Sequence, residues 1–343
     1  MTRLLVASLL IARTNALSAV ATRPTTMDAA SLRNADLARA AAAQQSNDRG
    51  LLWLEHVNIV VGRRDLAERF YFEEGLGCFT DPAKPRTPGA KGTMWANLGS
   101  QQFHLAEEAD DDPPQAVRGS IGLALPDVDA ACARLERLAA EVPSVNVERH
   151  SDARFTATCP WGNVFHCYAA RRGEKDAEKP KMVGLHAGDG YAGGDAFGVR
   201  GGPGIRYVEF LVDDAAAAAR AYAREFGAAA EASGDRAAVS CGLGPTHLLF
   251  ETAPTDAVAS QKQDGVHLCV YVDAFSERYD RLRETARVFT NPRFKHLDTC
   301  DTLDEALASR TFRFAFPEIP NLEHETRALS HVQFLKNVAY EPV

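Results

Sequence analysis

The strongest constraint on this chain is an internal repeat. Residues 54–79 read as an apolar strand, a turn, a helix rich in Ala, Arg and Glu, and a glycine stop, and residues 205–227 repeat that order. Weaker copies begin at Ser120 and at His267. A unit that recurs in this way indicates one supersecondary element used several times. The sequence therefore predicts four βαβββ modules, whose curved sheets face one another across a cleft.

Length and composition are those of a globular chain with more than one domain. The 343 residues, 45% apolar and 24% charged, are enough for two domains with buried cores. The net charge of -8 and the lack of a basic cluster argue against a nucleic-acid partner. The seven cysteines form no CxxC pair, so we interpret them as buried thiols in a reducing compartment.

The first 50 residues differ from the rest of the chain. They begin with an apolar run, carry three arginines before Met27 and have no acid before Asp28. The run is too short to span a bilayer, so we expect no membrane association and instead a cleavable targeting segment followed by disordered chain. A plastid is the favoured destination and a mitochondrion the alternative. The remaining interpretation is a disordered tail that carries no targeting signal.

Composition also divides the rest of the chain. A charged and then glycine-rich stretch is typical of a linker, because it offers little to bury. We expect an α+β protein of two tandem domains, each built from paired βαβββ modules that form an open curled sheet with a central cleft. The expected segments are a first domain of modules 1 and 2 (51–170), a linker (171–202), a second domain of modules 3 and 4 (203–320), and a C-terminal strap (321–343).

Several phrases resemble a known group of proteins. They are EHVNIVV…FY…GLG and WANLGSQQFHLAEE in module 1, GLALPDVDAACARL at the start of module 2, and CPWGN followed by VFHCY at its end. These segments resemble those of the vicinal oxygen chelate superfamily, which includes glyoxalase I, fosfomycin- and bleomycin-resistance proteins and extradiol dioxygenases. The resemblance is stronger over 51–170 than over 205–318. It implies a small-molecule ligand or substrate, and either a monomer with an internal pseudo-dimer or a homodimer.

The resemblance also implies where a divalent metal would bind. Superfamily ligands come from the first and last strands of paired modules, and those positions here hold His56, His104 and His166, with Ser120 in the remaining one. Strand alternation puts each histidine on a polar face. Neutral imidazoles bind Zn, Fe, Mn or Ni. The usual carboxylate is missing, and the two-histidine, one-glutamate set of extradiol dioxygenases is met within neither domain.

Neighbouring polar positions complete the expected sites. Residues on the same strand faces as the histidines are expected to contact substrate: Asn58, Gln102, Ser120 and Tyr168. In the second domain, the corresponding pocket is formed by Tyr207, Glu209 and His267. The strap could close that pocket with His324 or Glu325. One aligned histidine is a poor metal site, so we expect the second domain to be degenerate.

Three functions are compatible with these patterns, and the sequence leaves open whether the protein is an enzyme. The leading one is a metal-dependent lyase, isomerase or oxygenase that acts on a small oxygenated organic molecule in the first-domain cleft. The alternatives are a metal-free protein of the resistance type, which binds a small molecule, and a scaffold that kept the fold without catalysis.

Overall fold

The repeat is present as four βαβββ modules. The computed structural model describes residues 51–81, 84–87, 91–99, 101–107, 114–170, 203–241, 246–254, 266–319 and 322–328. The expected targeting segment (1–50) and linker (171–202) lie outside the described residues. Among the helices that are described, none combines the length and the apolar character needed to cross a membrane.

Modules 1 and 2 occupy the first half of the described chain. Module 1 contains β1 (Leu51–Val61), α2 (Arg64–Tyr71), β2 (Phe79–Thr80), β3 (Met94–Leu98) and β4 (Gln101–Glu107). Module 2 contains β5 (Ile121–Leu125), α3 (Val128–Glu141), β6 (Asn146–Ser151), β7 (Arg154–Thr158) and β8 (Val164–Ala169).

Modules 3 and 4 repeat this order with one addition. Module 3 contains β9 (Gly204–Val212), α4 (Ala215–Phe226), β10 (Ala230–Ser233), β11 (Arg236–Ser240) and β12 (His247–Thr252). Module 4 contains β13 (His267–Val272), α6 (Phe275–Thr285), β14 (Arg287–Val288), the extra helix α7 (Leu303–Ser309), β15 (Thr311–Ala315) and β16 (Glu323–Ala328).

The turn between strand and helix explains why the repeat contains an Asp. Asp127 caps α3 by accepting a hydrogen bond from the backbone N–H of Ala130, and Asp214 caps α4 in the same way through Ala217. An Asp in this position satisfies a backbone N–H group that the helix leaves unpaired. Gly227 then ends α4 in the left-handed conformation that glycine adopts without strain. The local repeat is therefore a strand followed by a capped helix.

The modules combine into two eight-stranded open sheets. One has the order β14-β15-β16-β13-β1-β4-β3-β2 and the other β10-β11-β12-β9-β5-β8-β7-β6. Within each module the first and last strands are parallel neighbours, and the antiparallel pairs β1·β13 and β5·β9 join the modules. The expected α+β fold with paired modules is confirmed. However, each sheet joins modules from both sides of the linker, 1 with 4 and 2 with 3.

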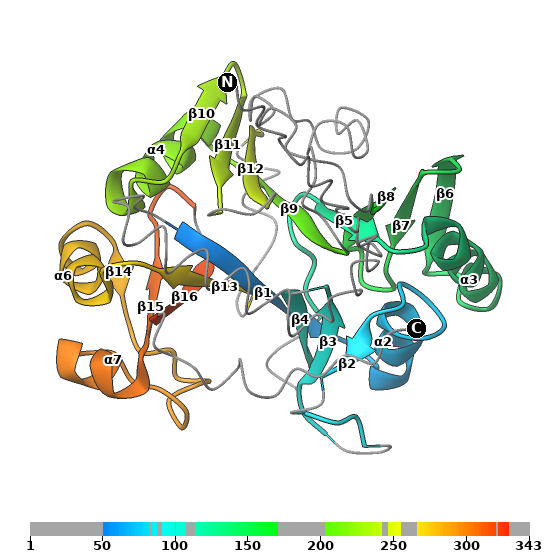
Figure 1. The fold of residues 1–343 in the computed structure, drawn as a ribbon, viewed down its shortest axis with the longest axis horizontal. Helices are drawn as coiled ribbons and strands as arrows, with labels where there is room; N and C mark the ends of the chain where they lie inside the picture. The colour runs from blue at the N-terminus through cyan, green and yellow to red at the C-terminus, as the bar shows by residue number, and fades with distance from the viewer. Residues whose placement is uncertain are drawn as a thin grey trace, which may run out of the picture.

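The hydrophobic cores, in contrast, follow chain order. Phe165 of module 2 lies 5.6 Å from Phe70 and 6.0 Å from Phe103 of module 1, between ring centroids. Tyr222 of module 3 lies 5.1 Å from Phe316 of module 4. Figure 1 shows α2 and α3 on one side of the molecule and α4, α6 and α7 on the other, with β1 between them. Each core thus belongs to two consecutive modules, whereas each sheet spans both halves of the chain.

One segment has a different structure from the one expected. Residues 323–328, which we expected in a C-terminal strap, form β16, and β16 pairs with β13 near the middle of its sheet. Module 4 was expected to end at residue 320, before β16. Helix α7 lengthens module 4 between β14 and β15, so its last strand lies later in the chain than the repeat suggests.

Replacing Phe165 by Ala tests the core shared by modules 1 and 2. The Phe165 side chain is fully buried, so truncation should lower the free energy of unfolding by about 3–5 kcal/mol. Leu307→Ala is the control: Leu307 is 45% exposed, and its truncation should change stability by less than about 0.5 kcal/mol. Denaturant unfolding measures both values. A loss below about 1 kcal/mol for Phe165→Ala would contradict a shared core.

Candidate metal site between β1 and β13

A bulge in β1 places two polar side chains side by side. Leu54 faces Val270 and Val57 faces Leu268, and all four belong to the hydrophobic core. Between these two pairs β1 has two residues, Glu55 and His56, whereas β13 has only Cys269. An extra residue interrupts the alternation of side chains. Glu55 and His56 therefore both lie beside Cys269, on the side of the sheet away from that core.

His56 meets a histidine and a glutamate from module 4. Its Nε2 lies 3.3 Å from His267 Nε2, and His267 Nε2 lies 3.4 Å from Glu325 Oε2. All three side chains are buried, and one donor atom from each lies within 4.8 Å of the others. His56 and His267 are 211 residues apart in sequence. The set of two imidazoles and one carboxylate exists only because β1 pairs with β13.

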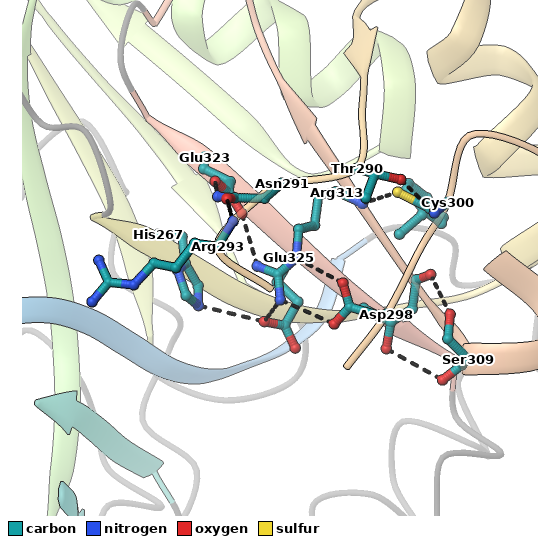
Figure 2. A network of polar contacts seen from close by, with 12 residues as sticks. His267, Thr290, Asn291, Arg293, Asp298, Cys300, Ser309, Arg313, Glu323 and Glu325 are labelled. Carbon is teal, nitrogen blue, oxygen red and sulfur yellow. Dashed lines mark hydrogen bonds and ion pairs between the residues drawn. The ribbon is translucent and has the colours of Figure 1, made fainter. Parts of the chain in front are cut away.

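Two arginines hold Glu325 in place. Arg313 Nη2 donates to Glu325 Oε2 at 2.8 Å (Figure 2). Arg327 Nη2 donates to Glu325 Oε1 at 2.7 Å. Burial alone would raise the pKa of Glu325, but the two guanidinium groups outweigh burial and hold this pKa well below its ordinary value. Glu325 is therefore an ionised carboxylate in a buried site.

Further carboxylates surround the same guanidinium groups. Arg313 also donates to Glu323 at 2.7 Å and to Asp298 at 3.1 Å, and Arg327 Nε lies 3.4 Å from Glu55 Oε2. In this set of contacts the carboxylates outnumber the guanidinium groups, four to two. Buried charges of one sign are costly unless they are compensated. The surroundings of Glu325 therefore favour a cation.

The histidines are suited to bind such a cation. Burial lowers the pKa of His56 to about 4, so the ring is neutral near pH 7 and carries a lone pair. His267 Nδ1 is buried and makes no hydrogen bond within the described part of the chain. Two imidazoles and one carboxylate form the facial ligand set of non-haem iron sites, and they also suit Zn²⁺. On donor chemistry, His56, His267 and Glu325 fit a divalent metal ion.

His104 lies beside this group rather than within it. Its ring stacks between Trp95 and His56, with centroid distances of 4.8 and 3.6 Å. Its Nε2 lies 3.1 Å from Gln102 Oε1, and Gln102 Nε2 donates to Asp81 Oδ2. Burial holds the pKa of His104 well below its ordinary value. These contacts orient the ring against His56.

The other expected ligand positions belong to the second sheet. His166 is on β8, where its Nδ1 lies 3.0 Å from Thr156 Oγ1, and Ser120 donates to Glu209 at 2.7 Å. The structure thus brings His56 and His104 together and puts His166 and Ser120 in the other sheet. Metal binding by His56, His104 and His166 as one set stays a prediction. Asn58 and Gln102 are on β1 and β4, in the sheet that also contains His56, His267 and Glu325.

The second sheet has no equivalent ligand group among the described residues. At its central junction Gly122 faces Tyr207, and a Cβ on Gly122 would lie 2.2 Å from the Tyr207 ring. The Tyr207 hydroxyl lies 3.5 Å from that of Tyr168. Tyr207 and Glu209 therefore lie beside Tyr168 and Ser120 in the second sheet. His267 was expected in the same pocket but is on β13, in the other sheet.

Sequence reasoning missed Glu325 as a ligand and Arg313 as its partner. The signal was present in the alternation of the segment 323–328. His324 points to the core, where it stacks on Phe314 and contacts Tyr222, whereas Glu323 and Glu325 point to Arg313. Treating this segment as the last strand of module 4 would have placed Glu325 at the position that His104 occupies in module 1.

Comparison with known proteins supports the fold. No family model matches the sequence, and no curated protein matches it. Among solved structures, a glyoxalase I variant from Zea mays matches with a TM-score of 0.50 and 11% identity, over 86% of this chain and 97% of that one. The 2,3-dioxygenase LapB from Pseudomonas sp. KL28 matches with a TM-score of 0.27 and 13% identity, over 86% and 94%. The chain has the fold of the vicinal oxygen chelate superfamily.

The acid sensitivity of the fold tests the burial of His324. Burial lowers the pKa of this residue to about 3 from 6.5, so between these values the unfolded chain binds one more proton than the folded protein. Stability should therefore rise with pH across this window and level off above it. His324→Gln should reduce the slope of unfolding free energy between pH 4 and 6 by about 1.4 kcal/mol per pH unit.

Denaturant unfolding at a series of pH values measures this slope for both proteins. Above pH 7 the two slopes should coincide, which serves as the internal control. Equal slopes between pH 4 and 6 would show that His324 is protonated in the folded state.

Proposed function

We propose that the protein is a metal-dependent enzyme that acts on a small oxygenated organic substrate at the junction of β1 and β13. The observation that carries the proposal is the convergence of His56, His267 and Glu325 within 4.8 Å in a buried site. This two-histidine, one-glutamate set is present within neither expected domain and is formed between residues from both sides of the linker. The matches to a glyoxalase I and a 2,3-dioxygenase are consistent with such chemistry but rest on fold alone.

The ligand set favours the oxygenase class over a lyase or isomerase. Three protein ligands of this type leave coordination positions open on iron. A bound divalent ion would supply Lewis acidity and a docking point for adjacent oxygen atoms of the substrate. Zn, Mn and Ni remain alternatives to Fe, because imidazole and carboxylate bind all of them.

The protein's own residues have separate roles in this proposal. Arg313 and Arg327 keep Glu325 ionised and fix its orientation, as outer partners of metal ligands do. His104, held by Gln102 and stacked on His56, orients the His56 ring. Burial keeps His104 neutral near pH 7, so it adds no positive charge beside the proposed metal ion. Asn58 pairs with His104 across β1 and β4 and is a proposed substrate contact on this sheet.

One observation favours the alternative of a metal-free binding protein. Both carboxylate oxygens of Glu325 already accept hydrogen bonds from arginine, so the site is partly satisfied without an ion. In that case the cleft would bind a small molecule through the same polar groups without turnover. Metal content separates the two functions.

Removing single ligands tests the metal site. Purified protein should bind one divalent ion at this site, and His267→Ala or Glu325→Ala should weaken that binding. The loss of metal affinity should exceed the roughly 10- to 100-fold that follows removal of a residue that only hydrogen-bonds to a ligand, because each change removes a direct ligand. Equilibrium dialysis with Fe²⁺, Mn²⁺ or Zn²⁺, followed by elemental analysis, measures the affinity.

His166→Ala is the matched control, since His166 is the strand histidine that lies in the second sheet. It should bind the ion as the unchanged protein does. If His166→Ala lost the ion and His267→Ala kept it, the proposal would fail and the set of His56, His104 and His166 would stand instead.

A further inference from the structure

We propose a second cation site on the opposite edge of the His56 ring, formed by Glu55, His56 and Cys269, that takes a thiophilic divalent ion such as Zn²⁺ or Cd²⁺. The site uses Nδ1 of His56, whereas the site proposed above uses Nε2. One ligand atom from each of the three residues lies within 4.8 Å of the others. Its existence does not depend on the proposed enzymatic function.

The contacts define the donor atoms. Cys269 Sγ lies 3.3 Å from Glu55 Oε2, and His56 Nδ1 lies 3.5 Å from the same oxygen. The carboxylate oxygen is therefore close to both the sulfur and the nitrogen. The bulge in β1 creates this grouping, because it places two residues of β1 opposite the single residue Cys269. A regular strand would alternate Glu55 and His56 to opposite faces.

An unsatisfied buried atom points to a ligand. His56 is fully buried, and its Nδ1 makes no hydrogen bond within the described residues. A buried polar atom without a partner is destabilising unless something binds it. Glu55 Oε2 lies 3.5 Å from this Nδ1, which is too long for a good hydrogen bond but leaves the two atoms placed to share an ion.

The three donor types select the ion. A thiolate, an imidazole and a carboxylate together suit Zn²⁺ and its softer analogue Cd²⁺, whereas Mg²⁺ and Ca²⁺ prefer oxygen ligands alone. On binding, the Sγ–H bond of Cys269 is replaced by an Sγ–metal bond and the proton leaves to solvent. Arg327, now 3.4 Å from Glu55, can release that carboxylate because it already makes shorter bonds to Glu325.

The shared ring couples the two sites. A neutral imidazole has a lone pair on only one nitrogen, so ions at Nδ1 and Nε2 compete for His56 unless the ring loses its remaining proton. A thiophilic ion bound at the second site should therefore lower the affinity of the first site for its ion.

Cadmium titration of the whole protein tests the second site. A cadmium–thiolate bond has an ultraviolet charge-transfer absorption that bound carboxylate or imidazole lacks. The unchanged protein should develop this band and saturate with one Cd²⁺ per chain. Cys269→Ser should abolish the band, and Glu55→Gln should weaken cadmium affinity at least tenfold.

Two control variants make the result specific. Cys241→Ser removes another fully buried thiol, directly after strand β11 of the other sheet, and should keep the band. His267→Ala should keep the band while losing the first-site ion, so the two proposals fail independently. No band in the unchanged protein would overturn the second site, whatever the variants do. A band retained in a folded Cys269→Ser protein, checked by circular dichroism, would also overturn it.

Discussion

The antiparallel pairing of β1 with β13 is the contact on which the candidate site depends. It joins the first and last modules into one sheet, so that His56 and His267 meet although 211 residues separate them. Each of these two modules packs its helix side against its own neighbour in sequence, as the separate aromatic contacts of Phe165 and Tyr222 show. The chain thus resembles a dimer whose two halves are linked, with sheets that cross from one half to the other (Figure 1).

The second sheet shows that this architecture does not by itself assemble a candidate metal site. The β5·β9 junction has the same antiparallel arrangement, but Gly122 and Tyr207 meet there, and the tyrosine ring fills the space beside the glycine. Ser120 donates a hydrogen bond to Glu209 there, and the described residues of this junction contain no group of three candidate metal ligands. A repeated backbone therefore supports different chemistry according to a few side chains at the junction.

The two arginines allow Glu325 to stay ionised although it is buried. A carboxylate taken out of water without compensation would become protonated or destabilise the fold. Arg313 and Arg327 keep Glu325 ionised, and Arg313 itself is oriented by Asp298, Glu323 and the ring of Phe294, whose centroid lies 4.2 Å from its Cζ. The residues that contact Glu325 and Arg313 here all belong to module 4.

The sequence by itself determined the modules, because strand alternation, helix caps and glycine stops act over a few residues and are visible in the text. It also placed His56 and His104 correctly on the polar faces of neighbouring strands. Only the tertiary structure decided which modules share a sheet, because edge pairing depends on how two packed cores meet and leaves no local pattern. For the same reason the bulge at Glu55 and the placement of His166 in the other sheet could not be predicted from the repeat. Glu325 was missed for a different reason, because α7 moves the last strand of module 4 later in the chain than the repeat suggests.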